Sequence, residues 1–264
     1  MKNFILNKSQ KLEYKKNGFL IVPNLYDAEE IGLLLKICKN DQDKKHIINN
    51  QHKDSMGLNS KYWLSTDIDQ LNIYNAISHG FRLVDTMEKL LDDEVYIYHY
   101  KMSIKDPLIG GSWEWHQDYG YWYQNNCIYP DMASVYIAVD AASKRNGCLQ
   151  FLKGSHKMGR IDHGKFGTQM GADPERVKIA LNYFELIYCE MSPGDAVFFD
   201  VNLLHRSDAN ESSYPRWGLI CSYNTKHNHC DDRPGHASYR YLQKWPDDEV
   251  KKLGIMQLES MAIK

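Results

Sequence analysis

Two histidines and one aspartate are the residues of this chain whose types and spacing could do chemistry. His116 and Asp118 form an H-x-D pair after a tryptophan-rich segment, and alternate positions at the end of a strand share one face, where both side chains can hold one metal ion. His205, in the later segment NLLHRS, is the candidate third ligand. Two imidazoles and one carboxylate leave three positions of an octahedral ion open, as in non-haem Fe(II) oxygenases.

A fixed cation is also needed if the open metal positions bind a dicarboxylate cosubstrate. Arg216 meets this need, because it lies a short distance after His205 at the start of the strand-like run RWGLICSYN. A guanidinium pairs with a carboxylate through two parallel hydrogen bonds, which an ammonium does not do. Ser207, two residues after His205, could add a hydroxyl donor to the same carboxylate.

Four stretches of the chain resemble the phytanoyl-CoA dioxygenase superfamily of Fe(II)- and 2-oxoglutarate-dependent oxygenases. They are WHQDYGYW (115–122), NGCLQFLKGSH (146–156), MSPGDAVFFDVNLLHRSDAN (191–210) and PRWGLICSYN (215–224), within a resemblance over roughly residues 14–224. It implies that His116, Asp118 and His205 hold iron and that Arg216 binds 2-oxoglutarate. It also implies a 2-oxoglutarate contact from a lysine before the first histidine. Lys101 and Lys105 both qualify, and the run Lys-Asp-Pro, similar to the family's Lys-Pro turn, favours Lys105.

The resemblance also implies a reaction. Dioxygen and 2-oxoglutarate would be consumed and succinate and CO2 released, while an unactivated C–H bond is hydroxylated. Asp118 favours oxygen insertion, because related halogenases lack this carboxylate. Desaturation or oxidative ring closure of an amino-acid-like substrate is an alternative outcome of the same chemistry.

The substrate suggested by the resemblance is a small charged or zwitterionic metabolite. The runs HQDYGYWY, GADPERV and LLHRSDAN are similar to the alkylaminophosphonate hydroxylases, and Trp122 stands where the ectoine hydroxylase branch has a tryptophan that helps to hold its substrate. The chain has no basic run for nucleotide phosphates, so an acyl-CoA is the less favoured alternative.

Aromatic residues follow the aspartate directly, and we predict that some of them contact the substrate. They are Tyr119, Tyr121, Trp122 and Tyr123. Aromatic rings can hold a cationic group by cation–π attraction. The alternative is that these side chains pack in the core or against residues 40–62.

The elements that position these residues change character along the chain. Residues 1–94 are predicted to be mainly helical, with a strand from Phe19 to Val22, a helix capped by Asp27 and a helix over residues 67–92. The polar residues 40–62 are expected to form a mobile or covering loop.

From Val95 onward, short apolar runs alternate with glycine, proline, asparagine and aspartate. This pattern predicts a β core over residues 95–224. We therefore expect a mainly β fold with flanking helices, a cupin-like jelly roll (double-stranded β-helix) in one domain spanning residues 1–264. The polar tail is expected to be irregular, with a short helix near residues 247–253.

Composition excludes several classes of partner. Lysine and arginine number 32 against 34 aspartates and glutamates, so no nucleic acid or anionic membrane is expected to bind. No apolar run is long enough for a membrane span, and a cytoplasmic protein is expected. The six cysteines lack a CxxC pair and are expected to be buried, reduced thiols. The oligomeric state is not readable.

Weaker patterns in the chain suggest other kinds of site, and two other classes of protein are possible for this fold. His227, His229 and Cys230 could bind zinc, but without a second ligand pair a solvated tail is favoured. A non-catalytic protein that binds 2-oxoglutarate or a metabolite, and a barrel with structural zinc, are the rival classes. The complete ligand set with Arg216 argues against the binding protein, and tight zinc that iron cannot replace would identify the structural-zinc barrel.

Overall fold

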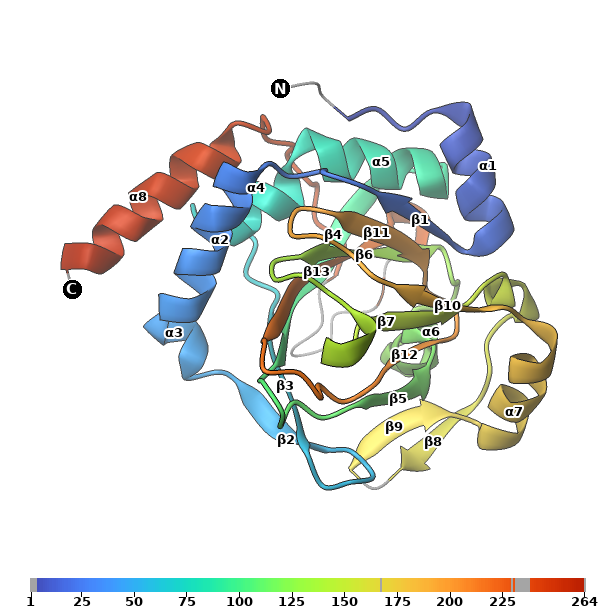
Figure 1. Cartoon of the computed structure of the whole chain (residues 1–264). Helices are drawn as coiled ribbons and strands as arrows, with labels where there is room; N and C mark the ends of the chain where they lie inside the picture. The colour runs from blue at the N-terminus through green and yellow to red at the C-terminus, as the bar shows by residue number, and fades with distance from the viewer. Residues whose placement is uncertain (1–3, 167, 229, 231–237, 264) are drawn as a thin grey trace.

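Two antiparallel sheets that face each other form the centre of the computed structural model, which describes residues 4–166, 168–228, 230 and 238–263 (Figure 1). The seven strands of the large sheet are, in spatial order, β1 (Phe19–Val22), β11 (Ala196–Asp200), β6 (Met132–Ala138), β13 (Arg216–Thr225), β4 (Val95–Lys105), β3 (Asn59–Ser65) and β2 (Asn49–Lys53). The small sheet has the order β10 (Leu186–Cys189), β7 (Leu149–Leu152), β12 (His205–Ser207) and β5 (Trp113–His116). A separate hairpin joins β8 (His163–Phe166) and β9 (Gln169–Ala172).

Helices cover the outer face of the large sheet (Figure 1). The α-helices are α1 (Lys8–Asn17), α2 (Ala28–Asn40), α3 (Gln42–Lys45), α4 (Ile73–His79), α5 (Phe81–Leu91), α6 (Asp118–Trp122), α7 (Pro174–Tyr183) and α8 (Glu249–Ile263). The 3-10 turns are η1 (Tyr123–Asn125), η2 (Lys144–Asn146), η3 (Ser155–Met158) and η4 (Lys226–Asn228). Apolar side chains of α2, α4, α5 and α8 pack with those of β4, β6 and β13 in the largest apolar cluster.

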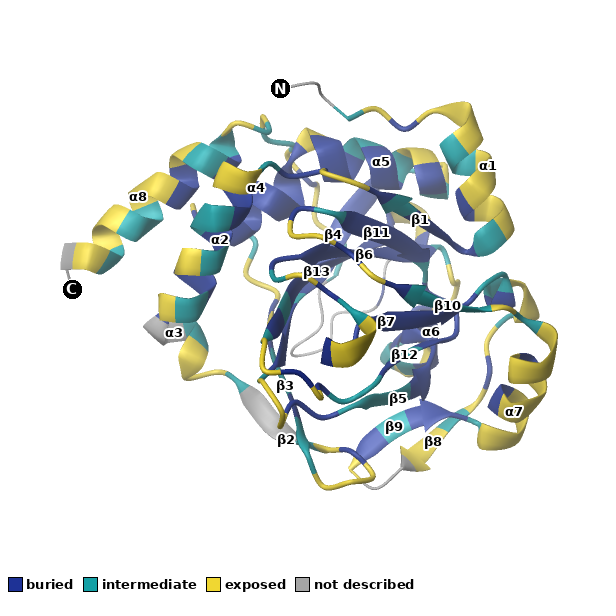
Figure 2. Ribbon diagram, viewed as in Figure 1, coloured by how far each residue is buried: buried dark blue, intermediate teal, exposed yellow. Residues whose placement is uncertain are grey.

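The central strands are buried on both faces, because helices cover one face of the large sheet and the small sheet covers the other (Figure 2). All residues of β6 are buried, as are ten of the eleven residues of β4. Such strands read as continuous apolar runs, which is why the sequence predicted them well. The fold is mainly β with flanking helices, as predicted.

The N-terminal third departs from the prediction in two places. Residues 40–62 are not a loop, because β2 and β3 extend the large sheet beside β4. The helix predicted over residues 67–92 is two helices, α4 and α5, separated at Gly80, whose backbone is extended. A side-chain carbon at Gly80 would lie 3.2 Å from the Ala76 carbonyl oxygen, a tight contact that a larger residue could make only if its neighbours shifted. The cap of α2 is as predicted, since Asp27 accepts hydrogen bonds from the amides of Glu29 and Glu30.

The C-terminal part and the cysteines also correct the prediction. The helix expected near residues 247–253 is the longer α8. Cys127 and Cys230 form a disulfide, whereas the other four cysteines are free and buried as expected. The two bonded residues lie 103 positions apart, so no local spacing could indicate the pair. Of the weighed zinc ligands, His229 lies outside the described residues. Within the part of the chain that the structure describes, no helix has the length and apolarity to cross a bilayer.

Candidate active site

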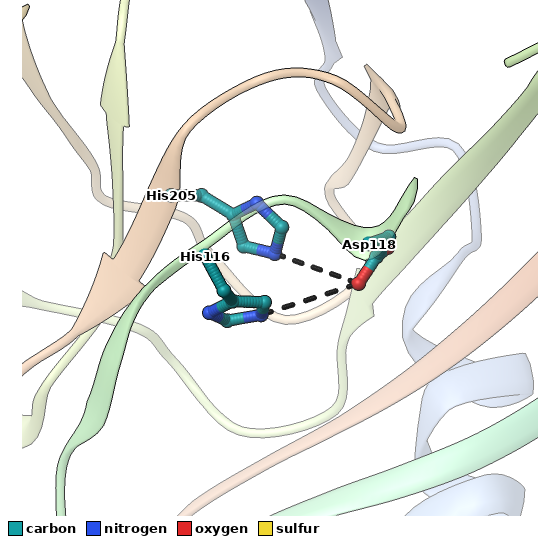
Figure 3. Close-up of side chains that lie close together, drawn as sticks. All are labelled: His116, Asp118 and His205. Atoms are coloured by element: carbon teal, nitrogen blue, oxygen red, sulfur yellow. Dashed lines mark ion pairs between the residues drawn. The ribbon is translucent and has the colours of Figure 1, made fainter. Parts of the chain in front are cut away.

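The three predicted metal ligands come together at one end of the small sheet (Figure 3). His116 ends β5 and His205 begins β12, and these residues are direct partners in the antiparallel register. Asp118 Oδ1 lies 4.0 Å from Nε2 of His116 and 3.8 Å from Nε2 of His205. All three side chains are buried and each offers one ligand atom, so the cluster could hold a metal ion.

Asp118 does not reach the site as a residue on the same face of strand β5 as His116. The strand ends at His116, and Asp118 is the first residue of α6. The turn at Gln117, not a continuing strand face, therefore brings the carboxylate beside the two imidazoles.

Hydrogen bonds fix which atoms face the centre of the cluster. His116 Nδ1 donates to the Glu114 carbonyl oxygen at 2.7 Å, and His205 Nδ1 donates to the Leu203 carbonyl oxygen at 2.9 Å. Each Nε2 therefore carries a lone pair, which is the form that binds a metal. Ser134 Oγ donates to Asp118 Oδ2 at 3.0 Å, so Oδ1 faces the histidines.

The charges of the cluster suit a divalent cation. Burial lowers the pKa of His116 well below its usual value, and the neighbouring His205 lowers it further. Burial also lowers the pKa of His205. Burial alone would raise the pKa of Asp118, but His205, Lys101 and His116 outweigh it and hold the pKa below its usual value. The donor set is therefore two neutral imidazoles and one carboxylate.

A cavity of about 360 Å³ lies between the two sheets and includes this cluster in its wall. Its deep end is lined by fully buried polar residues: Ser103, Tyr136, Ser207 and Arg216. Its outer end is lined by partly buried aromatic side chains: His52, Tyr62, Trp113 and Tyr121. The volume is in the range of sites for small molecules.

The deep end lacks a counter-ion and has unused hydrogen-bonding atoms. Arg216 is 1% exposed and donates to the Gly147 carbonyl oxygen at 2.8 Å and to Ser103 Oγ at 3.1 Å, but it pairs with no carboxylate among the described residues. Its Nε, the Ser207 hydroxyl and the Tyr136 hydroxyl have no partner in this part of the chain. An unsatisfied buried polar group costs about 1–3 kcal/mol. The end of the cavity therefore fits an anion with several oxygen acceptors, such as a carboxylate.

The structure separates the two candidate lysines. Lys105 is wholly buried and does not line the cavity, because its ammonium donates to the carbonyl oxygens of Gly111 and Asp208. Burial lowers the pKa of Lys105 well below its usual value, and the nearby Arg216 adds to this effect. Lys101, four residues earlier on the same face of β4, lines the cavity. The structure therefore does not bring Lys105, the preferred candidate, to the cavity wall.

The four predicted aromatic contacts divide into two pairs. Tyr121 and Trp122 line the cavity. Tyr119 does not, because its hydroxyl donates to the Cys127 carbonyl oxygen at 3.1 Å, and Tyr123 is 49% exposed beneath the guanidinium of Arg160. Successive residues of a helix point in directions about 100° apart, so side chains spread over residues 119–123 cannot all face one cavity.

Three aromatic residues at the outer end were not predicted. The rings of His52, Tyr62 and Trp113 lie 5.7–5.8 Å apart, centroid to centroid, and form one cluster. His52 and Tyr62 belong to the β2–β3 hairpin, which sequence reasoning placed in a loop. The aromatic pair Tyr62-Trp63, of residue types that favour strands, was the available signal. Apart from Asp118, no carboxylate lines the described cavity wall.

The sequence is similar to a known enzyme family and to several of its members. The sequence profile of the phytanoyl-CoA dioxygenase (PhyH) family matches residues 14–218. An ectoine dioxygenase of Bordetella bronchiseptica is 24% identical over 260 residues, covering 90% of this chain and 84% of the relative. The L-proline trans-4-hydroxylase of Streptomyces griseoviridis is 29% identical over 158 residues, covering 54% of this chain and 59% of the relative.

A solved structure has the same fold. EctD from S. alaskensis, determined with 2-oxoglutarate and 5-hydroxyectoine, superposes with a TM-score of 0.76 and 20% sequence identity, covering 92% of this chain and 89% of that chain. The likeness covers most of both chains, and the predicted jelly-roll fold is confirmed.

Proposed function

The chain belongs to the phytanoyl-CoA dioxygenase family and is an Fe(II)- and 2-oxoglutarate-dependent dioxygenase, and we propose that it hydroxylates an unactivated C–H bond of a small charged or zwitterionic metabolite. The observation that carries this proposal is one cavity in which the His116, Asp118 and His205 cluster lies between an anion-binding deep end and an aromatic outer end. Relatives named for ectoine and for L-proline support a substrate of this size and charge.

Each residue of the cavity has a defined part in this proposal. His116, Asp118 and His205 would hold Fe(II), which when bound activates dioxygen at the expense of 2-oxoglutarate, giving succinate and CO2. Arg216 and Ser207 would bind the far carboxylate of 2-oxoglutarate through the atoms that have no partner within the described chain. Lys101 would make a second contact with the cosubstrate. The buried walls around the cluster would keep bulk water from the reacting carbon.

The outer end of the cavity would select the substrate. With no carboxylate there to pair with an ammonium, a cationic group would rest on the rings of Tyr121, Trp122, Tyr62 and Trp113. An acyl-CoA is disfavoured, because the nucleotide and acyl chain together exceed a cavity of about 360 Å³.

The first experiment is anaerobic loading with Fe(II), followed by measurement of succinate release with amino acids, betaines, aminophosphonates and acyl-CoAs. A matched pair sharpens the panel: glycine betaine and 3,3-dimethylbutanoate have the same shape, but only glycine betaine carries a positive charge. Succinate release stimulated by small charged compounds supports the proposal. Stimulation by acyl-CoAs alone would overturn it.

Product mass and ligand variants complete the test. Hydroxylation adds one oxygen atom to the substrate, whereas desaturation and ring closure remove two hydrogen atoms. His116→Ala and Asp118→Ala should abolish succinate release while the fold survives, and His46→Ala, at an exposed histidine, should have no effect. Tight binding of 2-oxoglutarate without any succinate release would favour the non-catalytic binding protein.

We also propose a cytoplasmic location, because the reaction consumes a central metabolite and four of the six cysteines are free. The disulfide is the exception, and both of its cysteines are shielded from soluble thiols by burial. Cell fractionation of the source organism tests the location directly.

A further inference from the structure

The side chain of Gln117, the residue between the two ligands of the H-x-D pair, makes contacts that the sequence motif does not suggest. Gln117 is completely buried and all of its side-chain polar atoms are used. Its Nε2 donates to the carbonyl oxygens of Gly159 and Asn202, at 2.8 and 2.7 Å, and its Oε1 accepts from the amide of Ile161 at 2.7 Å. One side chain therefore joins three segments that are far apart in sequence.

Two of these segments carry the proposed metal ligands. Gln117 lies between His116 and Asp118, and Asn202 lies three residues before His205. A second hydrogen bond ties the same segments together, because the amide of Tyr119 donates to the Val201 carbonyl oxygen at 3.0 Å. The position of His205 relative to the H-x-D pair therefore depends on contacts made by residues 117 and 119.

The third segment, residues 155–163, holds both ligand segments from outside the cavity. His163 Nδ1 donates to the Ile161 carbonyl oxygen at 2.8 Å, which leaves Nε2 to accept from the backbone amide of Gln117 at 3.0 Å. Ser155 Oγ accepts from the amide of Leu204 at 2.9 Å, next to His205. A side-chain carbon at Gly120 would lie 2.0 Å from the His163 ring, so this ring fits closely against the first turn of α6.

We propose that Gln117 is a positioning residue that sets the spacing between His205 and the His116–Asp118 pair, with His163 as its backbone anchor. This inference rests on the proposed function of the three ligands. Groups that orient metal ligands typically contribute 10–100-fold to metal affinity or activity. Gln117 would act through the backbone of both ligand segments rather than by touching the metal.

The test is Gln117→Met, which keeps the length of the side chain, adds no charge and removes all three side-chain hydrogen bonds. Its matched control is Asn228→Leu, because Asn228 is also buried and its side chain makes three hydrogen bonds, two with Tyr129 and one with Asn224, away from the ligands. Co(II) binding, followed by visible absorption, and thermal unfolding of the metal-free protein are measured for both variants and the wild type.

The expected result is a similar loss of stability in both variants, with Co(II) binding weakened 10–100-fold in Gln117→Met alone. Equal Co(II) affinity in the two variants would reduce Gln117 to a packing role and overturn the inference. If Gln117→Met does not fold, His163→Leu, which leaves the glutamine side chain in place, should weaken Co(II) binding in the same direction, and unchanged binding would again overturn it. Failure of the proposed function is distinguishable, because the wild type itself would then bind Co(II) no better than His116→Ala.

Discussion

Two buried arginines, one among the helices and one in the cavity, differ in how their charge is satisfied. Arg82 on α5 is 6% exposed and donates to both carboxylate oxygens of Glu30, at 3.0 and 2.7 Å. Its Nε lies 3.2 Å from Asp247 Oδ1, and its guanidinium carbon lies 4.5 Å from the centre of the Tyr26 ring. Arg216 is more deeply buried, yet its partners within the described chain are a carbonyl, a hydroxyl and the face of Tyr136.

This difference separates a structural charge from a binding charge. A buried ion that the protein pairs completely, as Arg82 is paired, ties α2 and α5 to the turn before α8 and leaves nothing for a ligand. A buried cation without a counter-ion is costly, and the cost is tolerated where an anionic ligand supplies the missing charge. The two sites should therefore respond to substitution in opposite ways.

The largest effect is expected at the paired arginine. Arg82→Met leaves the Glu30 carboxylate buried without its partner, and breaking such a pair typically costs about 3–5 kcal/mol. Urea unfolding should show this loss, while the affinity for 2-oxoglutarate of the protein that remains folded should not change. Adding Glu30→Met should restore part of the stability, because the unpaired charge is then removed. If Arg82→Met were as stable as the wild type, the contrast between the two arginines would fail.

A smaller effect, on binding instead of stability, is expected at Arg216. Arg216→Met removes the charge proposed for the far carboxylate of 2-oxoglutarate, and charge-assisted hydrogen bonds contribute about 1.5–3 kcal/mol, so affinity should fall by roughly 10–150-fold. Stability of the ligand-free protein should change by less than about 1 kcal/mol, because an unpaired buried charge is lost together with its bonds. Calorimetric titration of Fe(II)-loaded protein with 2-oxoglutarate under argon measures the affinity.

The matched variant for this site is Arg216→Lys, which retains the charge and loses the planar fork. Its affinity for 2-oxoglutarate should lie between those of the wild type and Arg216→Met. Affinity equal to the wild type in Arg216→Met would move the carboxylate site to another cation, of which Lys101 is the candidate in the cavity.

The sequence predicted the parts of the site that depend on residue type and chain order. His116, Asp118, His205, Ser207 and Arg216 meet in one cavity as expected. The paired strands β5 and β12 bring the first four together, and β13 of the facing sheet supplies Arg216. Their roles in binding iron and 2-oxoglutarate stay predictions until tested.

The predictions that failed concern how deep the cavity extends between the sheets and in which direction a side chain points. Lys101 and Lys105 share a face of β4, and periodicity cannot say that the cavity ends between them. Tyr119 and Tyr121 differ because the chain turns into a helix at Asp118, which replaces the two-residue period of a strand. Gln117 gave no signal, because its partners, such as Gly159 and Asn202, are backbone atoms that any residue supplies.

The smallest effect is expected at a third kind of charge, paired but exposed to water. His227 Nδ1 lies 2.6 Å from Asp93 Oδ2 and Nε2 lies 2.8 Å from Asp131 Oδ2, with the imidazole 51% exposed. Hydrogen bonds raise the pKa of His227 above its usual value, and the bond to Asp93 contributes more than the bond to Asp131. Protonated His227 therefore stabilises the fold fully below the unfolded-state pKa of about 6.5, and this stabilisation is lost as pH rises through the folded-state pKa.

Thermal unfolding of the wild type and His227→Gln from pH 6 to pH 9 measures this contribution. The wild type should be more stable at pH 6 by a few tenths of a kcal/mol, because water and salt screen an exposed ion pair, and the difference should disappear by pH 9. Glutamine retains hydrogen-bonding groups, so a difference that stays constant across this range would mean that packing, not charge, distinguishes the two proteins. A stability difference as large as that of Arg82→Met would show that solvent exposure does not weaken a paired charge. Burial would then not explain why Arg82 and His227 differ.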